Sequence, residues 1–597
     1  MTTPKKEKDL KNIKARARTI TSQAAYGSDI IVDLLQQYGI EYASLNPGAS
    51  FRGLHDSIVN YGGNRPEIIE CTHEKVAVML AHGYARSAGK PMVAVLHDLV
   101  GLLHGAMGIY YAFVDEVPMV VLGGAGPMDA TRRRPYIDWI HSAQNQGDAI
   151  RDFTKWDDQP YSLSSLPESF ARAYGVASTE PKGPVYIGLD ISLQEDSLPH
   201  KIDLVDRKRL APQVLIGYDP ETLGMAAKML VAAKRPVVLA DRLGRNPSAV
   251  DSLVELADLL SIPVVDLGKR FNFPNTHPLD LTGSDILSDA DLVLALDVKN
   301  LYSALRQQDY FANQTNRLIK DECRIIDIGL RDLGIKGWAQ DFDRLPEADL
   351  RVLADTSLAL PQLLAMCKGI LGKRNRNDLE RRAESLKVRH DALRKGWLEQ
   401  SKTGWDSRPI STGRLAWEIW EAIKPFDWVL TGNTLSGWAR KLWDWEKPEQ
   451  YPGAMLGAGT EISISLGVAL AHKGSDKLIV AVEPDGDLLY DSSALWIASH
   501  HNLPMLVVMY NNRAYYNDWR HQEVIASRRG RPEKNAYVGM ELNNPPPDFA
   551  TLARSFGWHA EGPIENPNEI SGALHRAIRV IQEKGQPALI DAVTQFR

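Results

Sequence analysis

Two short polar motifs near the carboxyl end of the chain have residue types that suit a metal ion and a phosphate. Asp485-Gly486 follows the apolar run Lys477–Val482, and Asn512 follows a second apolar run, Pro504–Tyr510. A helical pattern over Ser492–His500 separates these runs, so the region is predicted to form a strand–helix–strand unit. A right-handed crossover would bring Asp485 and Asn512 to the same carboxyl edge of two parallel strands.

The chemistry available at that edge favours a hard cation. Carboxylate and amide oxygens are ligands that Mg²⁺ prefers, and Mg²⁺ takes its remaining ligands from water and phosphates. Gly486 permits a tight turn and lets backbone N–H groups approach a phosphate closely. Asp-Gly alone is an ordinary turn and Asn-Asn an ordinary strand end, but both within one such unit predict a metal and phosphate site.

The elements that must position these residues are predicted by short β-branched runs that alternate with helical patterns. Buried strands of this kind are typical of parallel sheets covered by helices on both faces. We therefore expect an α/β chain with three doubly wound parallel-sheet domains. The expected strands are Ala43–Leu45, Glu67–Cys71, Met92–Leu96, Met119–Leu122 and Val185–Gly188, then residues 235–240, Ile262–Val265, Leu292–Leu296 and Arg324–Ile328, then Trp428–Leu430, Lys477–Val482, Met505–Met509 and Ala588–Asp591.

Composition shifts divide the chain into five parts. We expect a charged N-terminal extension over residues 1–25, a first domain over 26–200 and a central domain over 205–365. A charged helical connector over 366–407 and a last domain over 408–597 would follow. The chain has 597 residues, a net charge of −6 and three cysteines with no metal-binding spacing. A hydrophobic content of 44% and a charged content of 24% exclude disordered, collagenous and coiled-coil classes. The even charge balance, the lack of a long apolar run and the cysteine usage predict no nucleic-acid or membrane partner and indicate a cytoplasmic enzyme.

The Asp485-Gly486 and Asn511-Asn512 motifs resemble the diphosphate signature of thiamine-diphosphate enzymes such as acetolactate synthase, pyruvate oxidase and benzoylformate decarboxylase. The resemblance extends from about Tyr26 to the end of the chain. It implies pyrimidine-binding, central and diphosphate-binding domains, with thiamine diphosphate and Mg²⁺ as cofactors. It also implies that Asp485, Asn512 and the carbonyl of Ala514 bind the metal.

The first domain resembles the same family at two further places, His73-Glu74 and Asn46-Pro47-Gly48-Ala49. The resemblance implies that Glu74 is catalytic and bonds the pyrimidine ring, in an apolar setting that would raise its pKa. Ile462 would support the bent cofactor, and the Thr460 carbonyl would face the aminopyrimidine. The cofactor-binding positions implied in all are Gly48, Asn433, Thr434, Thr460, Glu461, Ile462, Gly486, Asp487 and Tyr515.

Two histidines are candidates for handling substrate. His97 aligns with a histidine of benzoylformate decarboxylase, and His104 follows on the next helix. Either would donate a hydrogen bond to a substrate carboxylate or move a proton, and a structural role is the alternative for each. His141 is a weaker candidate, and the His500-His501 pair is expected to be structural.

Several residues depart from the family pattern. Asp487 stands where many relatives have a serine, and a carboxylate there would repel phosphate unless it turns away. Glu461 would serve as an acid–base group or form a salt bridge beneath the reacting centre. Arg242 and Arg245 flank the single glycine of a turn that is glycine-rich in flavin-containing relatives, so we expect no FAD. These arginines would hold a nucleotide or coenzyme A phosphate, or form surface salt bridges.

The polar run Trp519–Asn544 is expected to be a lid, a substrate loop or a solvated surface loop. The expected function is cleavage or formation of a C–C bond next to a carbonyl, by a lyase or an acyl-carbanion transferase. The leading hypothesis is decarboxylation of a 2-oxo acid, with or without acetolactate synthase-like carboligation. The alternatives are 2-hydroxyacyl-CoA lysis and a non-catalytic cofactor-binding subunit. The protein is expected to bind a small-molecule substrate. It is also expected to associate with further copies of itself, in a homodimer or homotetramer with active sites between subunits.

Overall fold

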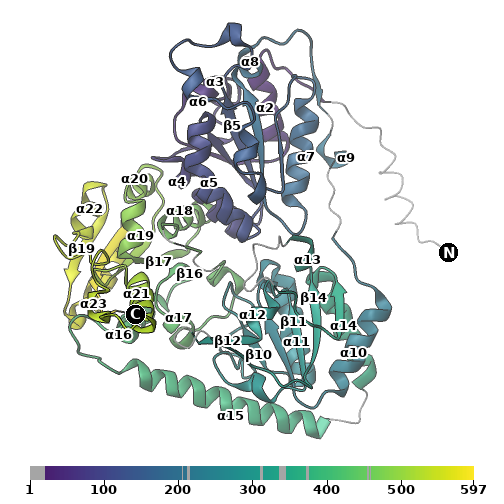
Figure 1. Cartoon of the computed structure of the whole chain (residues 1–597), viewed down its shortest axis with the longest axis vertical. Coiled ribbons are helices and arrows are strands. Elements are labelled where there is room, and N and C mark those ends of the chain that lie inside the picture. Colours follow the sequence, from purple (N-terminus) through teal and green to yellow (C-terminus); the bar gives the residue numbers. More distant parts are fainter. Residues whose placement is uncertain are drawn as a thin grey trace. The chain divides into compact units, whose positions relative to one another are not determined.

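Three parallel sheets flanked by helices form the framework of the chain (Figure 1). The computed structural model describes residues 20–204, 206–210, 215–309, 314–334, 344–371, 376–453, 456–457 and 459–596. These fall into two compact units, one of residues 1–85 and 90–214 and the other of residues 86–89 and 215–597. The predicted α/β class is confirmed, and most of the N-terminal extension lies outside the described residues. None of the helices in these ranges is both long and apolar enough to cross a membrane.

The first unit contains a six-stranded parallel sheet, in the order β3-β2-β4-β5-β7-β6. All five predicted strands are present, and the short, half-buried β6 was not predicted. The strands are β2 (Tyr42–Leu45), β3 (Glu67–Glu70), β4 (Met92–Leu96), β5 (Met119–Ala125), β6 (Trp156–Asp158) and β7 (Pro184–Asp190). The helices are α2 (Gly27–Gln37), α3 (Arg52–Asp56), α4 (Glu74–Ala88), α5 (Asp98–Val114), α6 (Asp138–His141), α7 (Leu166–Ser178), α8 (Ile191–Glu195) and α9 (Arg207–Leu210). The short pair β1 (Ile20–Thr21) and β8 (Asp203–Leu204) is antiparallel.

The central part of the second unit contains a five-stranded parallel sheet, in the order β10-β9-β11-β14-β15. Its strands are β9 (Pro236–Ala240), β10 (Val264–Asp266), β11 (Leu292–Leu296), β14 (Arg324–Gly329) and β15 (Leu350–Leu353). β12 (Arg306–Asp309) and β13 (Gln314–Arg317) form a separate antiparallel pair. The helices are α10 (Pro220–Ala232), α11 (Pro247–Leu260), α12 (Leu301–Ala304), α13 (Arg331–Gly334) and α14 (Thr356–Leu371). The charged connector forms the long helix α15 (Arg376–Ser401), as predicted.

The last part of the chain forms a second five-stranded parallel sheet, in the order β16-β17-β18-β20-β19. Its strands are β16 (Trp428–Asn433), β17 (Leu478–Pro484), β18 (Leu506–Asn511), β19 (His559–Ile564) and β20 (Ala588–Val593). The helices are α16 (Thr412–Ile423), α17 (Trp438–Leu442), α18 (Glu461–Ala471), α19 (Asp485–Tyr490), α20 (Ala494–His500), α21 (Tyr516–Arg528), α22 (Phe549–Ser555) and α23 (Pro567–Lys584). Every residue of β17, β18 and β20 is buried, which explains their continuous apolar runs.

The polar run Trp519–Asn544 is not simply an irregular loop, because its first part belongs to α21. None of the thirteen residues of α21 is buried, so the sequence has no apolar stripe to reveal the helix. Backbone hydrogen bonds close the base of this excursion, from Tyr515 N–H to Met540 O (2.8 Å) and from Leu542 N–H to Arg513 O (2.8 Å). The segment is therefore a helical excursion with a fixed base.

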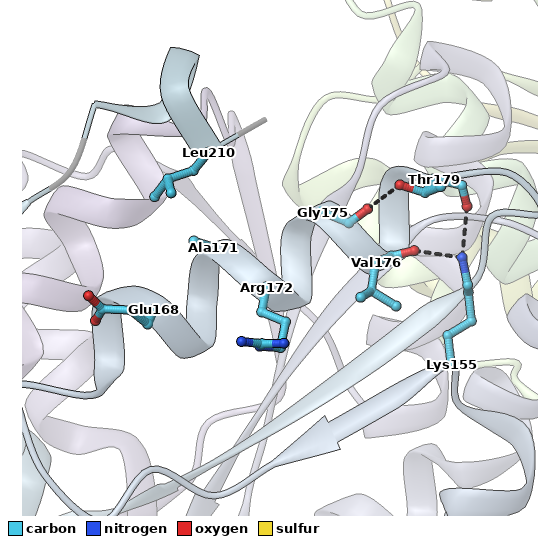
Figure 2. Close-up of a pocket in the computed structure, with 8 residues that line it drawn as sticks. All are labelled: Lys155, Glu168, Ala171, Arg172, Gly175, Val176, Thr179 and Leu210. Carbon is cyan, nitrogen blue, oxygen red and sulfur yellow. Dashed lines mark hydrogen bonds between the residues drawn. The ribbon is translucent and has the colours of Figure 1, made fainter. Parts of the chain in front are cut away.

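A pocket of about 460 Å³ lies beside α7 in the first unit (Figure 2). Lys155 Nζ donates hydrogen bonds to the carbonyls of Val176 (2.6 Å) and Thr179 (2.7 Å), which terminate that helix. Burial lowers the pKa of Lys155 to about 8. The pocket is lined by Lys155, Glu168, Ala171, Arg172, Gly175, Val176, Thr179 and Leu210, and none of these is a predicted site residue.

Arg440 of α17 joins the two halves of the second unit through a largely buried ion pair network. It lies 3.1 Å from Asp266 and 3.2 Å from Asp280, both in the central part.

We expect Arg440→Leu to destabilise the protein by about 3–5 kcal/mol, because two buried carboxylates lose their cation. Chemical denaturation would measure the loss. Arg381→Gln, at an exposed ion pair, is the control and should change stability by under about 1 kcal/mol; equal effects of the two variants would contradict this account.

Candidate active site

Glu74 lies at the first position of α4, directly after the turn that follows β3. Glu74 is buried, with 6% of its surface exposed. His104 of α5 reaches back to it, with 3.1 Å between His104 Nδ1 and Glu74 Oε2. The His104 ring also stacks on His73, with ring centres 4.9 Å apart. The structure thus brings the predicted Glu74 and His104 together as a hydrogen-bonded pair.

The expectation of a raised pKa for Glu74 is wrong for the chain by itself. Burial does raise it, but hydrogen bonds from its own backbone N–H, from Asn46 and from His104 outweigh burial, and the pKa is lowered. The sequence showed a helix N-terminus but not that the Asn46 side chain would reach it. Glu74 is therefore held as a carboxylate that can accept a proton or a hydrogen bond.

His97 follows β4 and precedes the first turn of α5. A Cβ atom on Gly48 would lie 2.6 Å from the Cβ of His97, so only glycine allows this loop to approach so closely. The predicted cofactor residue Gly48 and the predicted catalytic residue His97 are therefore in contact. Ser50, from the same loop, lies 2.9 Å from His97 Nδ1 through its hydroxyl oxygen.

His97, Asp98 and His141 bring one potential ligand atom each to within 4.8 Å of one another. The His141 ring meets the His97 ring edge-on, with centres 5.1 Å apart. Burial and the neighbouring Asp138 carboxylate raise the pKa of Asp98 to about 7. The weak candidate His141 thus lies beside His97, and sequence reasoning missed Asp98, although it directly follows His97 in the chain.

Asp485 and Asn512 meet at the carboxyl edge of β17 and β18, as the predicted strand–helix–strand unit requires. Asp485 Oδ2 lies 3.2 Å from the backbone nitrogen of Ala514, and Asn512 Oδ1 lies 3.0 Å from the same atom. All three residues are buried. Two side-chain oxygens therefore converge beside the Ala514 backbone. Oxygen ligands of this kind fit Mg²⁺.

The turn after Asp485 is shaped by a ring and by a helix end. A Cβ atom on Gly486 would lie 2.4 Å from the Tyr515 ring, so these two predicted cofactor residues pack directly together. Asp487 Oδ2 accepts a hydrogen bond from the N–H of Thr460, 3.4 Å away, at the start of α18. The unusual carboxylate thus turns toward a helix N-terminus, which is favourable for a negative charge.

The first turn of α18 carries the remaining predicted positions. Ile462 is fully buried, and the Thr460 carbonyl already accepts the Ile464 N–H (3.1 Å), which leaves one lone pair for another donor. Glu461 extends toward β16, because a Cβ atom on Gly432 would lie 2.5 Å from its Oε2. Asn433 and the buried Thr434 follow there, and Asn433 Oδ1 is a buried atom without a hydrogen-bond partner among the described residues. Such an orphaned acceptor fits a polar ligand.

Glu483, two residues before Asp485, is a buried acid that sequence reasoning missed. Its pKa is raised well above the usual range, first by burial and then by Asp487, Glu461 and Asp491. Burial and these neighbouring carboxylates therefore favour its neutral form. The signal in the sequence was an acid inside an otherwise apolar strand.

The carboxyl edge of the central sheet is acidic. Arg245 Nη2 lies 3.2 Å from Asp297 Oδ1. A Cβ atom on Gly244 would lie 1.6 Å from the carbonyl oxygen of Phe271, so internal packing requires this glycine. Four buried aspartates lie at or just after the ends of its strands: Asp241, Asp266, Asp297 and Asp355. Of these residues, Asp241, Gly244 and Arg245 belong to the turn that follows β9.

Three family models match the chain. The N-terminal TPP binding domain of thiamine pyrophosphate enzymes matches residues 26–151, the central domain residues 223–363, and the C-terminal TPP binding domain residues 432–592. The chain is 24% identical to a probable acetolactate synthase large subunit of Methanocaldococcus jannaschii, over 95% of this chain and 91% of that protein. It is also 24% identical to the acetolactate synthase isozyme 3 large subunit of Escherichia coli, over 93% and 92%.

Solved structures share the fold. A putative thiamin diphosphate-dependent enzyme from Mycobacterium smegmatis superposes with a TM-score of 0.71 at 19% identity, over 96% of this chain and 100% of that chain. The benzoylformate decarboxylase of Polynucleobacter necessarius gives a TM-score of 0.72 at 17% identity, over 96% and 99%. With all three domain models in order along the sequence, the chain belongs to the thiamine pyrophosphate enzyme family.

Proposed function

We propose that the protein is a thiamine-diphosphate- and Mg²⁺-dependent enzyme that decarboxylates a 2-oxo acid, with or without carboligation. The observation that carries this proposal is the convergence of Asp485 Oδ2 and Asn512 Oδ1 beside Ala514. The family's TPP-binding domains support the cofactor. The relatives named as acetolactate synthases and the neighbour named as a benzoylformate decarboxylase support the reaction class.

In this proposal Asp485, Asn512 and the carbonyl of Ala514 hold Mg²⁺. α19 begins at Asp485, and the positive end of its helix dipole favours a diphosphate there. Thiamine diphosphate, when bound, supplies the electron sink for breaking the bond next to the carbonyl. Ile462, which is fully buried, would support the cofactor, and Gly486 leaves room for the Tyr515 ring.

Glu74 orients the cofactor through one strong hydrogen bond. Because its pKa is lowered, the carboxylate meets the pyrimidine as an acceptor and stabilises a proton on that ring. His104, hydrogen-bonded to Glu74 and 58% exposed at its side chain, is placed to contact substrate or to relay that proton. His97 is the second group proposed to contact substrate.

The acidic central edge argues against 2-hydroxyacyl-CoA lysis. Coenzyme A carries phosphates, which need a cation that is not already neutralised by a carboxylate. Arg245 is already paired with Asp297. The same charges support our proposal that the central domain binds no FAD.

We further propose a cytoplasmic homodimer or homotetramer with active sites between subunits. In this proposal Glu74, which belongs to one compact unit, and Asp485, which belongs to the other, come from different subunits at each site. Sedimentation velocity of the protein loaded with thiamine diphosphate and Mg²⁺ would measure the oligomer.

The reaction is tested by incubating the loaded protein with pyruvate, with aromatic 2-oxo acids and with a 2-hydroxyacyl-CoA. Release of CO₂ from a 2-oxo acid, dependent on both thiamine diphosphate and Mg²⁺, is expected. Cleavage of the acyl-CoA alone would overturn the proposal in favour of the lyase. Identification of an aldehyde or a ligated product then separates decarboxylation from carboligation.

We expect Glu74→Gln to lower kcat by at least about a hundredfold, because a neutral amide cannot stabilise the ring proton. Mg²⁺-dependent binding of thiamine diphosphate, measured by calorimetry, should persist, since the diphosphate ligands are intact. Glu70→Gln, which changes an exposed glutamate at the end of β3, is the matched control and should keep its activity. Wild-type turnover in Glu74→Gln would remove Glu74 from the mechanism.

The purified protein should show no flavin absorbance band in the visible region. Added FAD should not bind in a fluorescence-quenching titration. The reason is that Phe271 packs against Gly244 in the turn after β9, and Arg245 of that turn is already paired with Asp297. Asp297→Asn is a useful comparison, because it releases Arg245 from its ion pair. A yellow wild-type protein would refute this prediction.

A further inference from the structure

Ser50 makes two contacts that fix the ring of His97. Its backbone N–H points at His97 Nδ1 over 3.4 Å, and its hydroxyl oxygen lies 2.9 Å from the same ring nitrogen. The hydroxyl oxygen also accepts the N–H of Asp98, 3.1 Å away. Both groups of Ser50 therefore converge on one side of the imidazole.

These contacts determine where the imidazole proton lies. A backbone N–H can only donate, so Nδ1 must be the acceptor. The Ser50 hydroxyl accepts from Asp98 and has its own proton left to donate to Nδ1. Since a neutral imidazole carries one N–H, that proton must be on Nε2 of His97.

Ser50 is itself held without freedom to turn away. Gln194 Nε2 donates to its carbonyl over 2.9 Å. A Cβ atom on Gly124 would lie 2.1 Å from the Ser50 hydroxyl oxygen, so the serine fills the space that this glycine leaves. Gly48, which has no Cβ atom, lets the same loop lie directly against His97. The serine is thus a rigid support on the ring, 1% exposed.

The charged and titratable groups around His97 favour its neutral form. Burial is the largest influence that lowers its pKa, and His141 and Arg134 lower it further against the opposing carboxylate of Glu74. Asp98 Oδ2 is 3.8 Å from Nδ1, beyond hydrogen-bonding distance. The groups facing the ring from its neighbouring elements are Ser50, Glu74, Asp98, Arg134 and His141.

We propose that Ser50 is a positioning residue that locks His97 as the neutral Nε2–H tautomer, so that His97 serves as a hydrogen-bond donor and not as the group that accepts protons. The natural recipient is a carboxylate or carbonyl oxygen, which matches the 2-oxo acid substrate class on which this inference rests. Ser50 acts through His97 and does not itself need to touch substrate.

The hydrogen bond from Ser50 to the neutral His97 ring can be tested without any substrate. Hydrogen–deuterium exchange at the imidazole C2 carbon, followed by mass spectrometry across pH, reports the titration of each histidine in the full-length protein. The midpoint of His97 should lie below the ordinary value of about 6.5. In Ser50→Ala it should rise by at least about half a unit, because a donor to the neutral ring is lost.

Ser192→Ala is the matched control for this measurement. Ser192 lies in the same domain, and its hydroxyl oxygen is buried without a hydrogen-bond partner among the described residues. The His97 midpoint should stay at its wild-type value in this variant. An unchanged midpoint in Ser50→Ala, or a wild-type midpoint above 6.5, would overturn the proposal.

Turnover separates a donor from a proton acceptor. Glutamine keeps an N–H at the place of Nε2 but cannot take up a proton, so His97→Gln should retain kcat/KM within about tenfold of wild type, with no His97 inflection in its pH profile. His97→Leu should lose about a hundredfold, and Ser50→Ala about tenfold. If His97→Gln is as inactive as His97→Leu, His97 must carry protons and the inference fails.

Failure of the proposed function has a different signature. If no 2-oxo acid is turned over, the titration of His97 in the wild-type, Ser50→Ala and Ser192→Ala proteins still decides whether Ser50 stabilises the neutral ring. If 2-oxo acids are turned over but the titrations do not differ, the function stands and the role of Ser50 is refuted.

Discussion

The pairing of β17 with β18 is the constraint on which the metal site depends. The two strands are parallel and in register up to their ends, with Glu483 opposite Met509 and Pro484 opposite Tyr510. Only this register lets Asp485 and Asn512, each the first polar residue after its strand, reach the same Ala514 N–H. A shift of one residue would turn one of the two side chains to the opposite face of the sheet.

Burial of so many acids near these edges has an electrostatic cost, and the chain lowers it in several ways. Burial and the neighbouring carboxylates favour the neutral form of Glu483, and Asp487 turns toward the N–H of Thr460. Asp98 has a pKa of about 7 and is only partly ionised at neutral pH. Each solution leaves negative charge where a helix end or a cation can stabilise it, and suppresses it elsewhere.

The sequence predicted the parts of the molecule that depend on local pattern. The buried strands, the helices α4 and α15, and the meeting of Asp485 with Asn512 all follow from apolar runs and from the handedness of crossovers. The helix α21 was missed because it buries no residue, and β6 because it has only three half-buried residues. Ser50 and Asp98 could not be recognised, because their roles arise from contacts between β4 and a loop distant in sequence. The lowered pKa of Glu74 was missed for the same reason.

One loop sets the protonation of two groups that lie at the ends of neighbouring elements. Asn46 donates to the Glu74 carboxylate and helps to keep it ionised, whereas Ser50 donates to His97 Nδ1 and keeps that ring neutral. Gly48 between them allows the close approach that both contacts need. Because the loop follows β2, which pairs with β4, its position is fixed by the same sheet that carries His97. The strand order of the first domain thus determines which of its polar groups accepts a proton and which donates a hydrogen bond.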